Sequence, residues 1–168
     1  MGAPEDHVRI VEELRGALGA ENVIGWKIPR AKRIYVAVKV EKLKEAVKHL
    51  AEKGFRHVST ISGVDVGDGI EVLYHLTKRA AGKGEGITLS LRVKTPMENP
   101  SLPTITDVIP GATLYEREIH DFVGVVFEGH TDLSPVMLPD NWPKDVHPLL
   151  KKWKLEDIKK RLTEVGSD

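Results

Sequence analysis

The chain has 168 residues and a mass of 18.7 kDa, which is typical of one domain with its own hydrophobic core. Its 25 Lys and Arg residues balance 25 Asp and Glu residues, which argues against general nucleic-acid binding, because such domains carry a basic excess. The absence of cysteine excludes Cys-ligated iron–sulfur clusters, Cys-type zinc sites, thiol catalysis and disulfides. No apolar run approaches the roughly 20 residues of a membrane span, and residues 1–19 carry charges throughout, so we expect an intracellular soluble protein without a signal peptide.

Two features of the composition go beyond this default. The chain contains no Gln and only three Met residues, and scarce thermolabile residues with abundant Lys and Glu favour a thermophilic source. The charge is also unevenly laid out: residues 31–60 hold eight basic and three acidic residues, whereas residues 101–150 hold two basic and eight acidic residues. We expect these segments to attract each other or to bind oppositely charged partners, unless the surface is merely uneven.

Local patterns predict the elements of the first half. Apolar residues spaced by three and four predict a helix over 4–19. Strands are expected over 22–28 and 33–40, because apolar and polar side chains alternate in the second of them. An amphipathic pattern then predicts a helix over 42–53.

Three further strands are predicted over 55–66, 70–78 and 87–94, joined as hairpins. The glycine-rich stretch 82–86 lacks the spacing of a phosphate-binding loop and does not open a helix, so a hairpin connection is the better interpretation. This order predicts an α+β fold with a mostly antiparallel sheet and helices on one face, and it disfavours a doubly wound parallel sheet.

The pattern changes after residue 95, where prolines interrupt the chain. A short helical piece is expected near 104–108, and a firmer helix over 114–123 with a capping box between Thr113 and Glu116. Beyond residue 127 we expect an extended Pro-rich tail, followed by a charged helix over 154–165. We therefore expect two parts, an α+β domain over 1–126 and a partner-docking tail with a final helix over 127–168.

The acids and histidines near the predicted helix 114–123 are the nearest approach to a catalytic or metal-binding group. Glu116 and His120 stand one helical turn apart, but Arg117 and Asp121 share this spacing, which is typical of an ion-paired helix face. From spacing alone, a salt-bridged surface, a protein interface and a metal or catalytic site all remain open.

A longer series of motif residues surrounds these acids. Glu-Arg-Glu at 116–118 is followed by an acid at 121, two apolar residues, Gly-Val-Val-Phe at 124–127 and a histidine at 130. Leu-Pro-Asp-Asn-Trp then stands at 138–142 and His-Pro-Leu at 147–149. In this order the residues resemble the signature of the respiratory complex I 30-kDa subunit family, whose members include the C-type subunit of NADH-quinone oxidoreductase.

The tail departs from the family pattern by losing two arginines and an acid after His130 and Leu149. Those losses suggest a divergent partner surface, similar to that of the related subunits in archaeal membrane-bound [NiFe] hydrogenases and other energy-converting complexes.

The resemblance implies a non-catalytic subunit in the peripheral arm of an ion-translocating oxidoreductase, on the cytoplasmic side of the cell membrane. Its partners would be the large hydrogenase-like subunit, the small iron–sulfur subunit and the membrane module. This chain would hold no cofactor, with iron–sulfur clusters and possibly a NiFe centre in the partner subunits. The residues expected at partner interfaces are Glu116, Arg117, Glu118, Asp121, Phe122, His130, Trp142, His147, Pro148 and Leu149.

Two alternatives stay open at this point. The first is a free-standing metal-dependent enzyme that uses Glu118, His120, Asp121 and His130; the second is a soluble binding module without a redox partner. For the subunit hypothesis we expect Arg117 to lie desolvated between carboxylates. Removal of Arg117 should then be costly, because it would leave buried negative charge unpaired.

Overall fold

The computed structural model describes residues 5–79 and 86–165. The glycine-rich stretch at 82–85, which we expected to form a hairpin connection, lies outside the described residues. The larger elements are α1 (Glu5–Leu18), β1 (Val23–Arg30), β2 (Arg33–Val38), α2 (Leu43–Glu52), β3 (His57–Asp65), β4 (Ile70–Lys78), β5 (Ile87–Thr95), α3 (Thr113–Val123) and α4 (Leu155–Val165). Two short strands, β6 (Ser101–Pro103) and β7 (Val126–Glu128), and three 3-10 turns at Ala20–Asn22, Val40–Lys42 and Pro110–Ala112 complete the described elements.

The main sheet has five strands in the order β1-β2-β5-β4-β3. All neighbours are antiparallel except β2 and β5, which pair in parallel with Arg33 opposite Thr88. β6 and β7 form a separate parallel pair. The structure therefore confirms the expected α+β class with a mostly antiparallel sheet, and it adds parallel pairing that the hairpin pattern did not predict.

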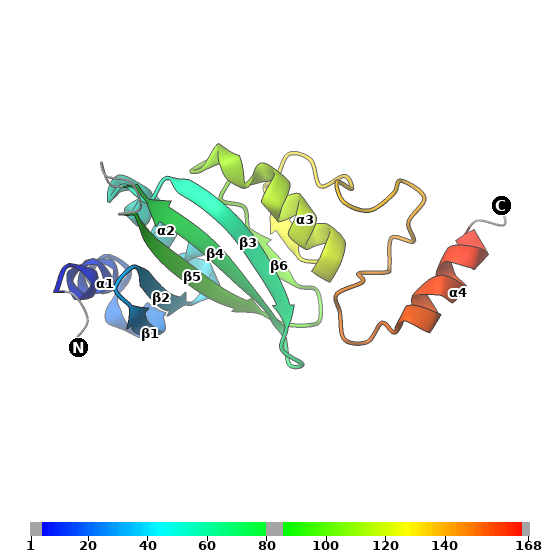
Figure 1. Cartoon of the computed structure of the whole chain (residues 1–168), viewed down its shortest axis with the longest axis horizontal. Coiled ribbons are helices and arrows are strands. Elements are labelled where there is room, and N and C mark those ends of the chain that lie inside the picture. The colour runs from blue at the N-terminus through cyan, green and yellow to red at the C-terminus, as the bar shows by residue number, and fades with distance from the viewer. Residues whose placement is uncertain (1–4, 80–85, 166–168) are drawn as a thin grey trace.

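One face of the main sheet carries the core. Every second residue of β4 from Ile70 to Leu76 is buried, together with the matching positions of β2 and β5. The apolar sides of α1 and α2 join these strands in one core cluster. α3 packs on the same face, because Gly63 of β3 pairs with the buried Val72 and lies against Ile119 and Val123. Figure 1 shows α3 beside β3.

The chain between β6 and α3 differs from the sequence-based prediction in two respects. Residues 104–108 form a turn and not a helix. The predicted capping box is also wrong, because Thr113 Oγ1 donates a hydrogen bond to the Pro110 carbonyl and the Glu116 carboxylate reaches Ile105 N instead of the start of α3. The 3-10 turn at Pro110–Ala112 leads directly into α3 and so removes the exposed helix start that such a box would cap.

The C-terminal part extends away from this body. The boundary that we expected at residue 126 falls inside β7, whose Phe127 is buried in the core, so the body continues to at least Glu128. Residues 129–154 contain neither helix nor strand. α4 follows at the far end of the molecule, and Leu155 on this helix is 67% exposed (Figure 1).

The contact between Gly63 and α3 leads to a prediction about stability. A Cβ atom on Gly63 would lie 2.8 Å from Val123 Cγ2, so Gly63→Val should push α3 off the sheet and lower the free energy of unfolding by about 2 kcal/mol. Gly25→Val, in a strand position with no atom within 4 Å of the added Cβ, is the matched control and should be nearly neutral. Denaturant unfolding of both variants measures the difference, and equal stability would show that α3 is not packed closely on β3.

Candidate functional site

Glu116 is the buried member of the Glu-Arg-Glu motif on α3. Its side chain is 0% exposed, and its two carboxylate oxygens accept hydrogen bonds from Thr104 Oγ1 at 2.6 Å and from Ile105 N at 2.9 Å. Both donors lie just after β6, so this carboxylate joins α3 to the chain that leads out of β6. Glu116 therefore lies beneath the surface of this chain, whereas the sequence-based prediction placed it at a partner interface.

Burial also changes the acidity of Glu116. Loss of solvation raises the pKa of this carboxyl to about 7, although hydrogen bonds from Ile105 N and Thr104 Oγ1 act in the opposite direction. The hydroxyl of Tyr74 is fully buried on β4 and has no hydrogen-bond partner in the described part of the chain. Its pKa is raised well above the usual value by burial and, second, by the negative charge of Glu116.

Arg117 points from α3 toward the segment 129–154. Its Nε donates to the Ser134 carbonyl at 2.9 Å, and its Nη2 donates to Ser134 Oγ at 2.8 Å and to the Pro135 carbonyl at 3.0 Å. The nearest carboxylate, that of Asp132, is 3.7 Å away and more than half exposed. The expectation that Arg117 lies between buried carboxylates is thus wrong: neutral oxygens of the C-terminal segment hold the guanidinium.

Asp121 lies one helical turn after Arg117 and holds the next residues of the same segment. A single oxygen, Oδ2, accepts backbone N–H donors from Val136 at 2.9 Å, Met137 at 2.8 Å and Leu138 at 3.3 Å. Three successive amides that converge on one carboxylate oxygen form an anion-binding concavity. Asp121 is only 4% exposed, so little water competes for these bonds.

Two histidines fix the return of the segment to the end of α3. His120 Nδ1 donates to the Val125 carbonyl at 2.9 Å, and His147 Nδ1 donates to the Asp121 carbonyl at 3.0 Å. Their rings meet edge to face with centroids 6.1 Å apart. Gly124 ends α3 with a left-handed φ of 76°, and a Cβ there would lie 2.6 Å from the His147 ring, so both conformation and space require glycine.

Two further contacts hold the segment where it passes the sheet. Leu149 N donates to the Phe122 carbonyl at 3.0 Å. Asp65, at the end of β3, accepts N–H donors from Lys151 at 2.9 Å and from Gly67 at 2.8 Å. The pKa of Asp65 is lowered, chiefly by the hydrogen bond from the Lys151 amide.

Between α3 and the segment lies a cavity of about 420 Å³. His120, Asp121 and Leu138 line one part of it, and Trp142, Val146 and His147 line another. Trp142 is half-buried and donates its Nε1–H to the Val146 carbonyl at 2.7 Å, which closes a local turn. The segment therefore arches over α3, held at both ends.

The four side chains of the metal-enzyme hypothesis are not brought together. The Asp121 carboxylate accepts hydrogen bonds from backbone amides, and the His120 ring donates one to a backbone carbonyl. His130 Nε2 donates to the Thr113 carbonyl at 3.3 Å, while its Nδ1 accepts from Asp132 N. Within residues 5–79 and 86–165, no three His, Asp or Glu side chains are close enough to hold a metal ion.

The same region contains a carboxylate without a partner among the described residues and several large apolar side chains that are exposed to solvent. Glu118 is half-buried on α3 and has no ion pair or hydrogen bond among the residues that the structure describes. Large apolar side chains are exposed on the segment and on the described part of α4, and we call them the apolar strip: Val136, Met137, Leu149, Leu155 and Leu162. Of these, the sequence-based prediction placed only Leu149 at a partner interface, because the apolar spacing of a helix does not reveal whether the fold covers that face.

Known proteins share both this fold and this region. Residues 36–159 match the family described as respiratory-chain NADH dehydrogenase, 30 Kd subunit. Subunit 5 of the NADH-quinone oxidoreductase of Thermus thermophilus is 33% identical over 157 residues, which cover 88% of this chain and 72% of that protein. A subunit of the F420H2 dehydrogenase of Methanosarcina mazei is 32% identical over 143 residues, covering 80% of this chain and 86% of that protein.

A solved structure extends the likeness to three dimensions. A chain of the membrane-bound sulfane sulfur reductase, an archaeal respiratory membrane complex, superposes with a TM-score of 0.78 at 27% identity. The match covers 93% of this chain and 91% of that one. The fold is therefore that of a subunit type found in respiratory membrane complexes. This chain belongs to the 30-kDa subunit family of the respiratory-chain NADH dehydrogenases, which confirms the resemblance seen in residues 116–149.

The amide contacts of Asp121 predict how the segment is held. Asp121→Ala leaves three N–H groups without their acceptor and should lower the free energy of unfolding by about 2–4 kcal/mol. Limited proteolysis of the variant should then cut first within residues 129–154, whereas the native chain should be cut there more slowly. Asp140→Ala, which removes an exposed carboxylate of the segment that has no hydrogen bond or ion pair among the described residues, is the control. The same cleavage rate in both variants would contradict the anchoring role.

The raised pKa of Glu116 predicts a pH dependence of stability. Because the folded chain holds this proton more tightly than the unfolded chain, the contribution of Glu116 to stability is fully present below pH 4.5 and is lost as pH rises through about 7, by up to about 3 kcal/mol. Glu116→Gln should flatten the slope in this window, and Glu118→Gln on the same helix should leave it unchanged. Denaturant midpoints measured from pH 4 to pH 8 test this, and an unaltered slope in Glu116→Gln would assign the dependence to another group.

Proposed function

We propose that this chain is a non-catalytic structural subunit in the peripheral arm of a membrane-bound, ion-translocating oxidoreductase, where it packs on the large hydrogenase-like subunit. Membership in the 30-kDa subunit family makes it a subunit of a complex I-like or membrane-bound respiratory complex. The observation that carries the finer proposal is the apolar strip. The chain fixes residues 129–154 firmly by polar contacts and then displays apolar side chains on them, which is what a docking surface requires.

The relatives support a scaffold role. Their names refer to NADH and quinone, to F420H2 and to sulfane sulfur, so related subunits occur in complexes with different electron donors and acceptors. A subunit shared by such different reactions is better suited to holding neighbours than to the reaction itself. The lack of cysteine agrees with this, since iron–sulfur clusters are held by thiolates. We place the iron–sulfur clusters, and a NiFe centre where one exists, in the partner subunits.

The α3 region supplies the geometry for this role. Arg117 and Asp121 set the path of the segment, so that Pro148 and Leu149 are presented beside the end of α3. Glu118 offers a carboxylate without a partner in the described chain, and such a group can form a charge-assisted hydrogen bond across an interface. α4 adds Leu155 and Leu162 at the far end, so one partner can be contacted over a long distance.

We further propose that the chain lies on the cytoplasmic side of the membrane, next to the small iron–sulfur subunit and above the membrane module. None of the helices in the described part of the chain is both long and apolar enough to span a bilayer. Attachment to the membrane through partner subunits fits this finding and the membrane-bound nature of the sulfane sulfur reductase.

Assembly of the complex tests the proposal. Leu155→Glu with Leu162→Glu places two charges on the apolar strip, and the yield of intact complex and its electron-transfer activity should fall several-fold. The isolated chain should unfold within about 0.5 kcal/mol of the native free energy, because both side chains are exposed. Lys160→Glu, on the polar side of α4, changes the net charge by the same amount and should assemble normally. Normal yield from the double variant would instead favour a free-standing binding module.

A further inference from the structure

The face of the main sheet opposite the core has no helix over it in the described part of the chain. Strand alternation places Tyr35 and Ala37 of β2, Leu73 of β4 and Arg92 of β5 on this side, and we call it the open face. A groove of about 370 Å³ crosses it over β1, β2, β5 and β4. It lies on the sheet face opposite α3, so it is a different surface from the apolar strip.

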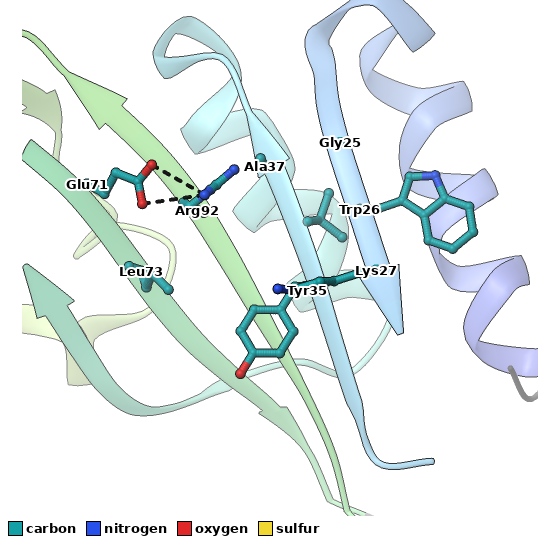
Figure 2. Close-up of a pocket in the computed structure, with 9 residues that line it drawn as sticks. Gly25, Trp26, Lys27, Tyr35, Ala37, Glu71, Leu73 and Arg92 are labelled. Carbon is teal, nitrogen blue, oxygen red and sulfur yellow. Dashed lines mark hydrogen bonds and ion pairs between the residues drawn. The ribbon is translucent and has the colours of Figure 1, made fainter. Parts of the chain in front are cut away.

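The groove has an apolar floor and a charged rim. The floor consists of Ala37, Leu73 and the ring of Tyr35, and Gly25 leaves space beside them because it has no side chain. Figure 2 shows Lys27 and Tyr35 on one side of the groove and the Glu71–Arg92 pair on the other, while Trp26 points away from it. Lys27 Nζ lies 5.3 Å from the centre of the Tyr35 ring.

The β1–β2 hairpin at the rim is rich in positive charge. Residues 23–38 contain four basic and no acidic residues, namely Lys27, Arg30, Lys32 and Arg33. Arg33 lies two residues before Tyr35 and hence on the open face, where its charge, after burial, is the second cause of a lowered pKa of His75. By contrast, Arg92 is paired with Glu71 at 3.3 Å and Lys94 with Asp68 at 2.6 Å.

The acidic part of the chain does not supply a counter-charge for Lys27 and Arg33. Among the described residues, the ion pair between Lys44 and Asp107 at 2.8 Å links the basic segment 31–60 to the acidic segment 101–150, and it lies at α2, away from the open face. Lys27 and Arg33 have no ion pair in the described part of the chain. The attraction expected between the two segments therefore does not involve Lys27 or Arg33, and the charges of these two side chains on the β1–β2 hairpin are available to another molecule.

We propose that the open face binds an extended acidic segment of a second polypeptide, with one apolar side chain on the floor of the groove and carboxylates beside Lys27 and Arg33. The occupant is a polypeptide because the groove combines an apolar floor with cations on separate strands. A single phosphate would require donors that converge on one point, and a lipid surface would require cations on a protruding surface. This binding does not depend on docking at α3 or on the proposed function.

Binding of a designed peptide to the full chain tests the proposal. The probe is a fluorescein-labelled peptide Asp-Glu-Val-Leu-Val-Glu-Asp, measured by anisotropy at low ionic strength. Lys27→Gln with Arg33→Gln should weaken binding about tenfold or more, while Lys159→Gln with Lys160→Gln on α4, which removes the same charge, should change it less than about twofold. Replacing the central Leu of the peptide by Asn should also weaken binding, because the floor then loses its apolar contact.

Four results would overturn the proposal. They are failure of the peptide to bind, equal weakening by both double variants, displacement of the peptide by millimolar inorganic phosphate, and stronger capture of the chain by phosphatidylglycerol vesicles through Lys27 and Arg33. Thermal unfolding of each variant shows whether the fold is intact. Should the double variant unfold early, the single variant Lys27→Gln, at an exposed position, gives the same comparison against Lys159→Gln.

Discussion

One carboxylate oxygen determines the course of the C-terminal third of the chain. Asp121 Oδ2 gathers three successive backbone amides, and Arg117 takes the carbonyls just before them. A segment without helix or strand lacks the regular hydrogen bonds that pair backbone N–H and C=O groups. Here the side chains of Asp121 and Arg117 supply partners for these groups. The cavity under the arch, the return through His147 and the display of the apolar strip all follow from these bonds.

The Glu-Arg-Glu helix works in three directions because successive residues on a helix point about 100° apart. Glu116 faces inward and joins α3 to the end of β6, Arg117 faces the segment, and Glu118 remains without a partner in the described chain. A short run of charges thus serves the interior and the local surface at once, and it leaves one carboxylate without a contact among the described residues. Spacing on the helix alone cannot assign these roles, since the roles depend on what packs against each side.

Periodicity was enough to predict α1, α2, the five main strands, α3 and α4, because their apolar residues recur at the spacing of a helix or a strand, although β1 and the described part of α4 bury no side chain fully. Two failures are local, namely the helix expected at 104–108 and the capping role of Thr113, and the others involve contacts between residues far apart in the chain. Parallel pairing of β2 with β5 joins Arg33 to Thr88, and burial of Glu116 depends on Thr104 and Ile105. The motif residues were recognised in order, but their contacts with residues 134–138 are made mostly to backbone atoms, which leave no signal in the sequence.

The placement of β5 between β2 and β4 has a consequence for folding during synthesis. The β1–β2 hairpin and helices α1 and α2 leave the ribosome well before β5, and the hairpin's inner edge stays unpaired until residues 87–95 emerge. Closing so distant a parallel contact is slow, and an unpaired edge meanwhile invites association with other nascent chains. The basic side chains of this hairpin repel a second copy during that interval, so the charge that marks the open face also protects the chain before the sheet is complete.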